Sequence, residues 1–204
     1  MKTYLWKINK EKLNNTNLAL YSNFVKKKYK ISSSNDFNKL WKWSVDNPKF
    51  FWKSIWDFTK VKGKQGKILL KESDIFFKNR FFPDAKLNYA KNLLTKNNEK
   101  KSIIFKSENG YKNSLSWKNL NLNVAQISNW MKSNGIKKGD RVAAYLPNIP
   151  ETVVAYISTA ALGGVWSSCS PDFGTSGVID RFSQISPKIL FIGDKYFYNG
   201  KKIN

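Results

Sequence analysis

Hydrophobic side chains in the first half of the chain recur at helical spacing. Phe37, Leu40 and Trp41 stand at positions i, i+3 and i+4, which predicts one apolar face of an α-helix. Ser34 or Asn35 comes just before this pattern, and either side chain can accept a hydrogen bond from the first turn. We therefore expect a capped amphipathic helix here.

Two more helices follow in the pattern. Asn47 and Pro48 combine a cap residue with proline at the first helical position, and apolar residues then share one broad face across 51–58. A shorter helix is expected over 88–94, where apolar side chains again recur at helical spacing. The region 34–98 is therefore predicted to be helical and rich in aromatic core residues.

The second half of the chain alternates strands with helices. Strands are predicted at 102–106, 111–115, 141–145, 165–168 and 188–192. Helices are predicted at about 117–134, 150–162 and 176–185. Alternation with helices of this length implies right-handed crossovers, so the expected fold class is α/β, with a mostly parallel sheet and helices on both faces.

Three zones follow from these patterns. Residues 1–33 are polar and rich in Lys and Asn, so we expect a partly loose lead-in. Residues 34–98 form the helical region, and 99–204 begin an α/β domain whose sheet is expected to be incomplete at Asn204. The longest mostly apolar stretch, 149–166, is broken by polar residues and two glycines, so we expect no membrane span and a cytoplasmic protein.

Two residue types are nearly or wholly missing, and this excludes several kinds of chemistry. The chain has no His, so it can form no Ser-His-Asp or Cys-His arrangement, no His metal ligand and no His-based pH switch. Its single Cys excludes an internal disulfide framework and a Cys-cluster zinc site. We therefore expect neither a metal site nor a His-dependent catalytic site in this chain.

The charge is strongly basic, with 36 Lys+Arg against 14 Asp+Glu and a formal net charge of +22. A basic chain can bind nucleic acid or an anionic membrane. Arginine, which makes bidentate phosphate and guanine contacts, occurs only at Arg80, Arg141 and Arg181, and the lysines are scattered among polar and aromatic residues. This distribution favours a solvated surface over a nucleic-acid site.

The helical region holds four tryptophans: Trp41, Trp43, Trp52 and Trp56. Between lysines they could stack nucleobases, as in a non-catalytic basic module that binds nucleic acid or protein. Their helical spacing favours instead a role in the hydrophobic core.

The most distinctive segment for chemistry is 168–177, which is rich in Ser and Gly and contains Asp172. It leaves the predicted carboxyl end of a parallel strand and enters a helix, which is where open α/β sheets bind ligands. It is neither a Gly-x-Gly-x-x-Gly nor a Walker A loop, so its spacing alone favours an ordinary turn. Cys169 reads as a small buried residue. We expect Asp180 and Arg181, which lie within the following helix, to have structural roles, and Arg181 could anchor a neighbouring loop.

Several separated segments resemble the acyl-CoA synthetases of the adenylate-forming superfamily. They occur in the family's order, at 87–94, 139–155, 164–174 and 178–188. The first is similar to the end of the N-terminal helical region in the acetyl-CoA synthetase branch. The last two are most similar to members of that branch that activate acetoacetate.

The resemblance implies an α/β enzyme that is larger than these 204 residues and that catalyses a two-step reaction. The carboxylate of acetoacetate attacks the α-phosphate of Mg-ATP to give an acyl-adenylate and pyrophosphate, and the thiol of CoA then displaces AMP. Acetoacetate, ATP and CoA are thus the implied small-molecule partners, with Mg²⁺ as metal cofactor of the whole enzyme. A ligase for another short-chain acid is the nearest alternative.

The family's ATP-binding motifs do not occur among the 204 residues. A Thr/Ser/Gly loop ending in Pro-Lys is missing, as are the adenine and ribose motifs and the catalytic Lys. The resemblance therefore implies an N-terminal portion of the enzyme, inactive alone, to which we assign no catalytic residue.

The resemblance also implies that this chain contains part of the site that binds the nucleotide end of CoA. In acetyl-CoA synthetases a Phe- and Gly-rich loop meets the CoA adenine, and two arginines spaced i, i+3 hold its 3′-phosphate. The arginine places fall on Tyr198 and Lys201, of which only the lysine keeps a positive charge. The loop has lost its double Gly, and its place falls on Ser170, Pro171, Asp172 and Phe173.

Overall fold

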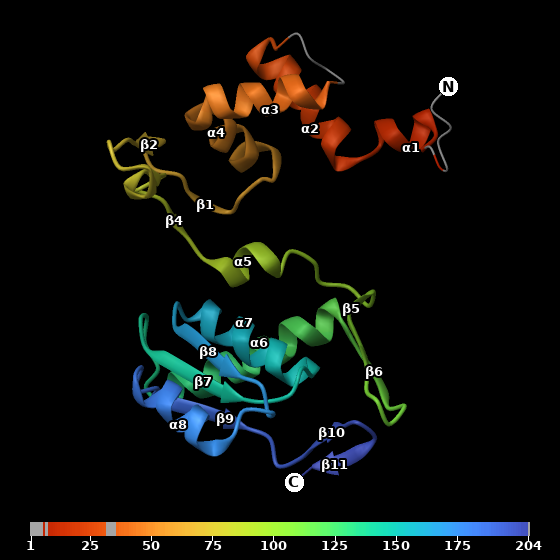
Figure 1. The fold of residues 1–204 in the computed structure, drawn as a ribbon, viewed down its shortest axis with the longest axis vertical. Coiled ribbons are helices and arrows are strands. Elements are labelled where there is room, and N and C mark those ends of the chain that lie inside the picture. Colours follow the sequence, from red (N-terminus) through yellow and green to blue (C-terminus); the bar gives the residue numbers. More distant parts are fainter. Residues whose placement is uncertain (1–5, 7, 32–35, 204) are drawn as a thin grey trace. The chain divides into compact units, whose positions relative to one another are not determined.

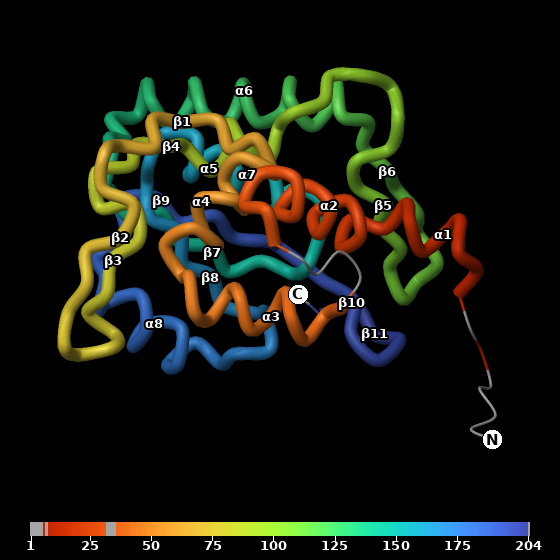
Figure 2. The backbone as a smooth tube through the Cα atoms, turned by 90° about the horizontal axis from the view of Figure 1, so that it is seen from above, coloured from red at the N-terminus to blue at the C-terminus, as the bar shows by residue number. Residues whose placement is uncertain are grey.

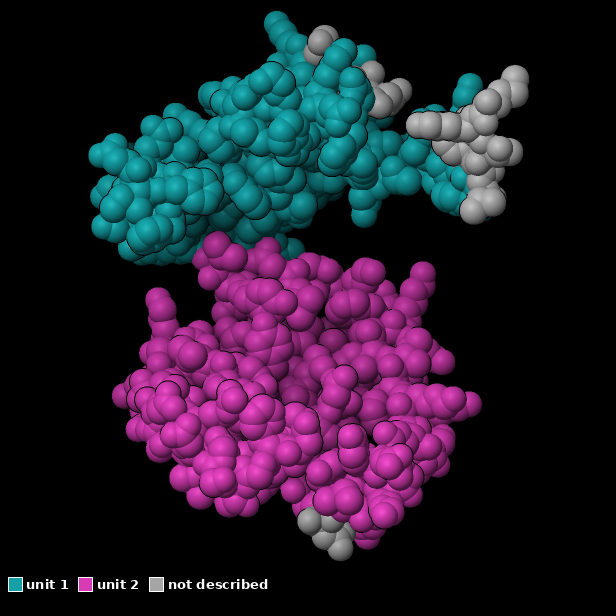
Figure 3. Space-filling model, viewed as in Figure 1, with its two compact units in different colours: residues 1–86 teal, residues 87–204 magenta. Residues whose placement is uncertain are grey.

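The computed structural model describes residues 6, 8–31 and 36–203, which divide into two compact units, Met1–Lys86 and Leu87–Asn204 (Figure 3). We describe each unit by itself. The predicted domain boundary between 98 and 99 stays a prediction. The cap candidates Ser34 and Asn35 lie outside the described residues; the carboxylate of Asp36 accepts from the first backbone N–H groups of the following helix instead.

Four helices build the described part of the first unit (Figure 1). They are α1 Lys10–Asn14, α2 Asn17–Tyr29, α3 Phe37–Asp46 and α4 Pro48–Phe58. Pro48 occupies the first turn of α4 as predicted, but Asn47 does not cap it, because its side chain donates instead to the carbonyl of Trp43.

Helix α2 lies where the sequence pattern suggested a loose lead-in. Thr16 caps it by accepting from the backbone N–H of Ala19, and Tyr21 and Val25 are buried one turn apart. These two side chains and Leu40 of α3 form a core against aromatic residues of α3 and α4. A short apolar stripe is enough to fold a segment whose other positions are Lys and Asn.

The tryptophans of this unit do not behave alike. Trp43 packs against the core cluster, as the helical spacing predicts. Trp41 is 58% exposed and Trp52 is 43% exposed, whereas Trp56 packs against Phe82. The expected core role is therefore right for part of the set only.

Short extended pieces complete the first unit. They are β1 Gly63–Lys64, β2 Leu70–Lys71, the 3₁₀ turn Phe76–Lys78, β3 Arg80–Phe81 and β4 Lys86–Leu87. β2 and β3 pair antiparallel. Gly66 has φ +83°, and a Cβ placed on it would come 2.6 Å from the Cβ of Asp84, so this loop requires glycine.

The second unit contains the parallel sheet. Its strands are β7 Arg141–Tyr145, β8 Val165–Cys169 and β9 Ile189–Ile192, in the spatial order β8-β7-β9. Both neighbours run parallel to β7, with Val142 opposite Trp166 and Ile189. The predicted α/β class and parallel pairing are confirmed.

Helices and hairpins surround this sheet. The helices are α5 Tyr89–Leu93, α6 Trp117–Ser133, α7 Pro150–Ala161 and α8 Thr175–Ser183. The hairpins are β5 Lys101–Lys106 with β6 Lys112–Ser116, and β10 Tyr196–Tyr198 with β11 Lys201–Ile203. The last hairpin was not predicted.

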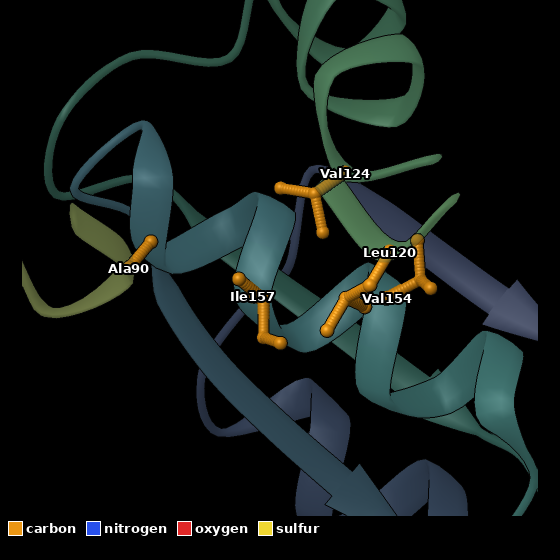
Figure 4. Close-up of a cluster of buried hydrophobic side chains, with 5 residues drawn as sticks. All are labelled: Ala90, Leu120, Val124, Val154 and Ile157. Atoms are coloured by element: carbon orange, nitrogen blue, oxygen red, sulfur yellow. The ribbon is translucent and has the colours of Figure 1, made fainter. Parts of the chain in front are cut away.

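The two faces of β7 pack against different helices. Ala143 packs with Val178 and Phe182 of α8, whereas Val142 packs with Met131 of α6. Figure 2 shows α6 and α8 on opposite sides of the strands, so the predicted helices on both faces are confirmed. A third cluster joins α5, α6 and α7 (Figure 4): Ala90, Leu120, Val124, Val154 and Ile157.

No helix within the described ranges is both long and apolar enough to cross a bilayer.

Candidate functional site

The loop between β8 and α8 occupies the place where parallel sheets bind ligands. β8 ends at Cys169 and α8 begins at Thr175, so residues 170–174 lie beyond the carboxyl end of a parallel strand. Gly174 stands at the N-cap and provides no side-chain cap to the first turn of α8. The start of this helix therefore keeps the positive end of its dipole without a capping side chain.

A tyrosine at the end of the central strand holds this loop. The hydroxyl oxygen of Tyr145 lies 2.7 Å from the carbonyl oxygen of Pro171 and 2.7 Å from that of Phe173. One hydroxyl carries one proton, so Tyr145 donates to one carbonyl at a time while the other stays within reach. The two contacts fix the loop backbone at two positions.

Arg181 reaches the same loop from α8. Its guanidinium carbon lies 4.5 Å from the centre of the Phe173 ring, a cation–π contact, and that ring remains 37% exposed. Asp180 faces elsewhere, since its carboxylate accepts from the amide of Gln184 at 3.4 Å. The structural roles expected for Arg181 and Asp180 stay predictions, but Arg181 contacts the loop directly.

The other two predicted residues lie on the β10–β11 hairpin. Tyr198 and Lys201 face each other as a register pair across the turn Asn199–Gly200, in which both residues have positive φ. Both side chains are exposed. A spacing of i, i+3 in the sequence thus becomes a cross-strand pair.

The structure brings this hairpin to the loop. The hydroxyl of Tyr196 donates to the carbonyl of Pro171 at 3.3 Å, and the N–H of Gly200 donates to Glu108 Oε2 at 3.3 Å. Tyr196 therefore joins the hairpin to the loop through the backbone oxygen of Pro171, whereas the turn beside Tyr198 and Lys201 bonds to Glu108.

Sequence reasoning missed Tyr145 and Tyr196, which make these connections. The available signal was a tyrosine at the last position of an otherwise apolar buried strand, since a phenol in such a place needs a hydrogen-bond partner. Cys169, by contrast, is free and buried, as expected.

Asp140 has the structural surroundings expected of a turn residue. Its carboxylate pairs with Lys188 at 2.8 Å and accepts from the N–H of Lys137 at 2.7 Å. These two donors hold the pKa of Asp140 below its usual value. The pair joins the turn before β7 to the residue that precedes β9.

None of the predicted site residues lines either of two cavities among the described residues. One of about 570 Å³ is bordered by the β5–β6 hairpin, the start of α7 and the segment Asp194–Phe197 that carries Tyr196. Another of about 1730 Å³ lies in the first unit beside Trp52, Phe76 and Arg80. In the part of the chain that the structure describes, no three His, Cys, Asp or Glu side chains gather as a metal site would require.

Comparison with known proteins agrees with this fold. The family described as AMP-binding enzyme matches residues 92–203, which is more than half of the chain, so the chain belongs to the AMP-binding enzyme family.

Within this family, the similarity points to one group. An acetoacetyl-coenzyme A synthetase from Rhizobium meliloti (strain 1021) is 39% identical over 97% of this chain and 30% of its own length. An acetoacetyl-CoA synthetase from Xenopus tropicalis is 36% identical over 92% of this chain and 28% of its own length.

A solved structure extends this similarity to three dimensions. The acetoacetyl-CoA synthetase from Streptomyces lividans matches 99% of this chain and 32% of its own, with a TM-score of 0.89 and 32% identity. The chain is therefore homologous to acetoacetyl-CoA synthetases, and it spans about 30% of the length of the curated relatives it matches.

Proposed function

We propose that this chain is the N-terminal part of an ATP-dependent ligase that converts acetoacetate, ATP and CoA to acetoacetyl-CoA, AMP and pyrophosphate. The observation that carries the proposal is the similarity to acetoacetyl-CoA synthetases along nearly the whole chain, in sequence and in fold. The substrates are small molecules, and the scattered lysines serve as a solvated surface.

The contribution of this chain to that enzyme is part of the binding site for the CoA nucleotide. Phe173 offers a partly exposed ring to an adenine base, with the guanidinium of Arg181 over the same ring. Lys201 offers an exposed ammonium to a 3′-phosphate, and Tyr198 lies directly across the hairpin from it. The hydrogen bond from Tyr196 to Pro171 supports the proposal, because it joins the hairpin to the loop at one point.

CoA, when bound, supplies the thiol that takes up the acyl group. The residues of this chain bind and orient its nucleotide end, and none of them acts on the reacting carbonyl. Lysine is a weaker clamp for phosphate than the two arginines that the family resemblance implies, since it presents a point charge rather than a planar fork.

The described residues do not form a complete binding site for ATP or Mg²⁺. The phosphate-loop pattern is missing from the sequence, and the described residues gather no three side chains of the metal-binding types. We therefore expect the purified 204-residue chain to form neither acetoacetyl-AMP nor acetoacetyl-CoA. Detection of either product by mass spectrometry with this chain alone would contradict that expectation.

The nucleotide site can be tested directly by NMR titration. Adenosine 3′,5′-bisphosphate should shift the amide signals of 170–174 and 196–203, and AMP, which lacks the 3′-phosphate, should bind more weakly. Lys201→Ala should lower the affinity about threefold to tenfold, as loss of one partly solvated charge contact does. The matched control is Lys202→Ala, which removes the neighbouring lysine of the same strand.

Two results would overturn this assignment: no shifts in these segments, or equal losses for Lys201→Ala and Lys202→Ala. The choice of acid needs the intact gene product, with acetoacetate and acetate compared by kcat/KM. A higher value for acetate would favour the ligase for another short-chain acid.

A further inference from the structure

We propose that Tyr145 and Tyr196 are positioning residues that join the loop 170–174 to the β10–β11 hairpin and so form the coenzyme site as one unit. The inference rests on the function proposed above for that site. It adds two residues that neither the sequence motifs nor the family resemblance pointed to.

Tyr145 is rigidly placed, which a positioning residue needs. It ends β7, the middle strand of the parallel sheet, and the three residues before it, Val142, Ala143 and Ala144, are fully buried. Its ring packs against the cluster that contains Cys169 and the core residues of α8. A hydroxyl on this ring can therefore hold the loop against a fixed reference.

The loop needs such a support because its own backbone bonding is sparse. The N–H of Phe173 donates to the carbonyl of Ser170 at 3.1 Å, and α8 then begins at Thr175. The carbonyls of Pro171 and Phe173 both lie 2.7 Å from the Tyr145 hydroxyl. Removal of this hydroxyl leaves the carbonyl of Phe173 without this donor and the carbonyl of Pro171 with only the longer contact to Tyr196. A carbonyl that turns toward the site would repel a phosphate.

Tyr196 links the second half of the site through the same atom. The carbonyl oxygen of Pro171 has two lone pairs and lies within hydrogen-bonding distance of both tyrosine hydroxyls. Tyr196 stands two residues before Tyr198 on the same strand, so its side chain lies on the same side of the hairpin. The shared acceptor thus links the strand that carries Tyr198 to the loop that carries Phe173.

Hydroxyl deletions test the proposal with little disturbance to packing. The variants are Tyr145→Phe, Tyr196→Phe and the double variant. The matched control is Tyr156→Phe, which deletes a hydroxyl from a partly buried tyrosine of α7 that contacts Tyr89 and Trp166. Far-UV circular dichroism and thermal unfolding check that each variant is folded.

The first readout needs no ligand. Relaxation and amide exchange of 170–174 should show greater loop motion in Tyr145→Phe, and motion in both the loop and the hairpin in Tyr196→Phe, but no change in Tyr156→Phe. Unchanged loop motion in both site variants overturns the proposal, whatever the chain binds.

The second readout is the affinity for adenosine 3′,5′-bisphosphate at a temperature where every variant is folded. Each site variant should bind about threefold to tenfold more weakly, as expected for loss of one hydrogen bond, and the double variant should lose less than the product of the two. A merely structural role would lower the melting temperature and leave the affinity of the folded chain unchanged, which also overturns the proposal. The two proposals can fail separately. If the variants show increased loop motion but the wild-type chain does not bind the probe, the proposed nucleotide site is refuted and the positioning contacts stand.

Discussion

The two units of this chain reach stability by different means. In the first unit, aromatic rings meet edge to face around Tyr21, and its hydroxyl lies 2.6 Å from Ser54 inside the core. In the second unit, the middle residues of the central strand, Val142, Ala143 and Ala144, are small and completely buried between helices. The first core depends on specific polar and aromatic contacts, whereas the second depends on close packing. The stability of the two units should therefore respond differently to substitutions that remove side-chain volume, restrict the backbone or remove a charge.

The largest effect is expected from loss of volume in the second unit. Met131→Ala removes a side chain with no exposed surface and should lower the free energy of unfolding of that unit by about 2–5 kcal/mol. Urea denaturation followed by NMR signals of each unit measures it. Leu122→Ala, in the same helix but 54% exposed, is the control and should change stability by no more than about 0.5 kcal/mol. Equal effects would mean that the core of this unit is not close-packed.

A smaller effect is expected from a backbone change in the first unit. Gly66→Ala combines a left-handed conformation with a clash against Asp84, and should cost about 1–3 kcal/mol. Asp84 also accepts from the N–H groups of Lys67 and Ile68, so it cannot withdraw freely. Gly110→Ala has the same φ with no atom within 4 Å, and should cost only about 1 kcal/mol. Thermal unfolding of both variants gives the comparison, and a cost no larger at Gly66 would remove the argument from the clash.

The smallest effect is electrostatic and also belongs to the first unit. Burial alone would raise the pKa of Asp57, but hydrogen bonds from Lys28 at 2.5 Å and Lys53 at 2.7 Å outweigh it and lower that pKa. A lowered folded pKa gives stability that is present above the unfolded pKa, near 3.9, and is lost as the pH falls through the folded value.

Asp57→Asn should therefore destabilise the first unit by about 1 kcal/mol or less at pH 7, and the difference should vanish in strong acid. Asp46→Asn, which breaks an exposed pair with Lys42, should have a smaller effect at pH 7. Denaturation curves between pH 7 and 2 check both, and a wild-type advantage that persists at pH 2 would contradict the assigned cause.

The same contrast explains what could be predicted from the sequence. The helices of the second unit follow from local signals: Ser116 caps α6 by accepting from Asn119, and Pro150 opens α7. Helix α2 was missed because its stripe of Tyr21 and Val25 is short and surrounded by Lys and Asn. Its folding depends on partners in α3 and α4 that periodicity cannot reveal.

The candidate site shows a similar limit. The loop could be located because its composition and its place after a strand are local features. The hydroxyl contacts of Tyr145 and Tyr196 join segments that are 25 residues or more apart along the chain, so no local pattern encodes them. The CoA assignments to Ser170, Pro171, Asp172, Phe173, Tyr198 and Lys201 remain predictions that the titration above addresses.

The attachment of the loop through backbone oxygens has an evolutionary consequence. Tyr145 and Tyr196 bind the carbonyls of Pro171 and Phe173, which every amino acid possesses, rather than their side chains. Substitutions at these loop positions can therefore change what the loop recognises without breaking its attachment to the sheet. We therefore expect the sequence of the loop to diverge more freely among homologues than the two tyrosines.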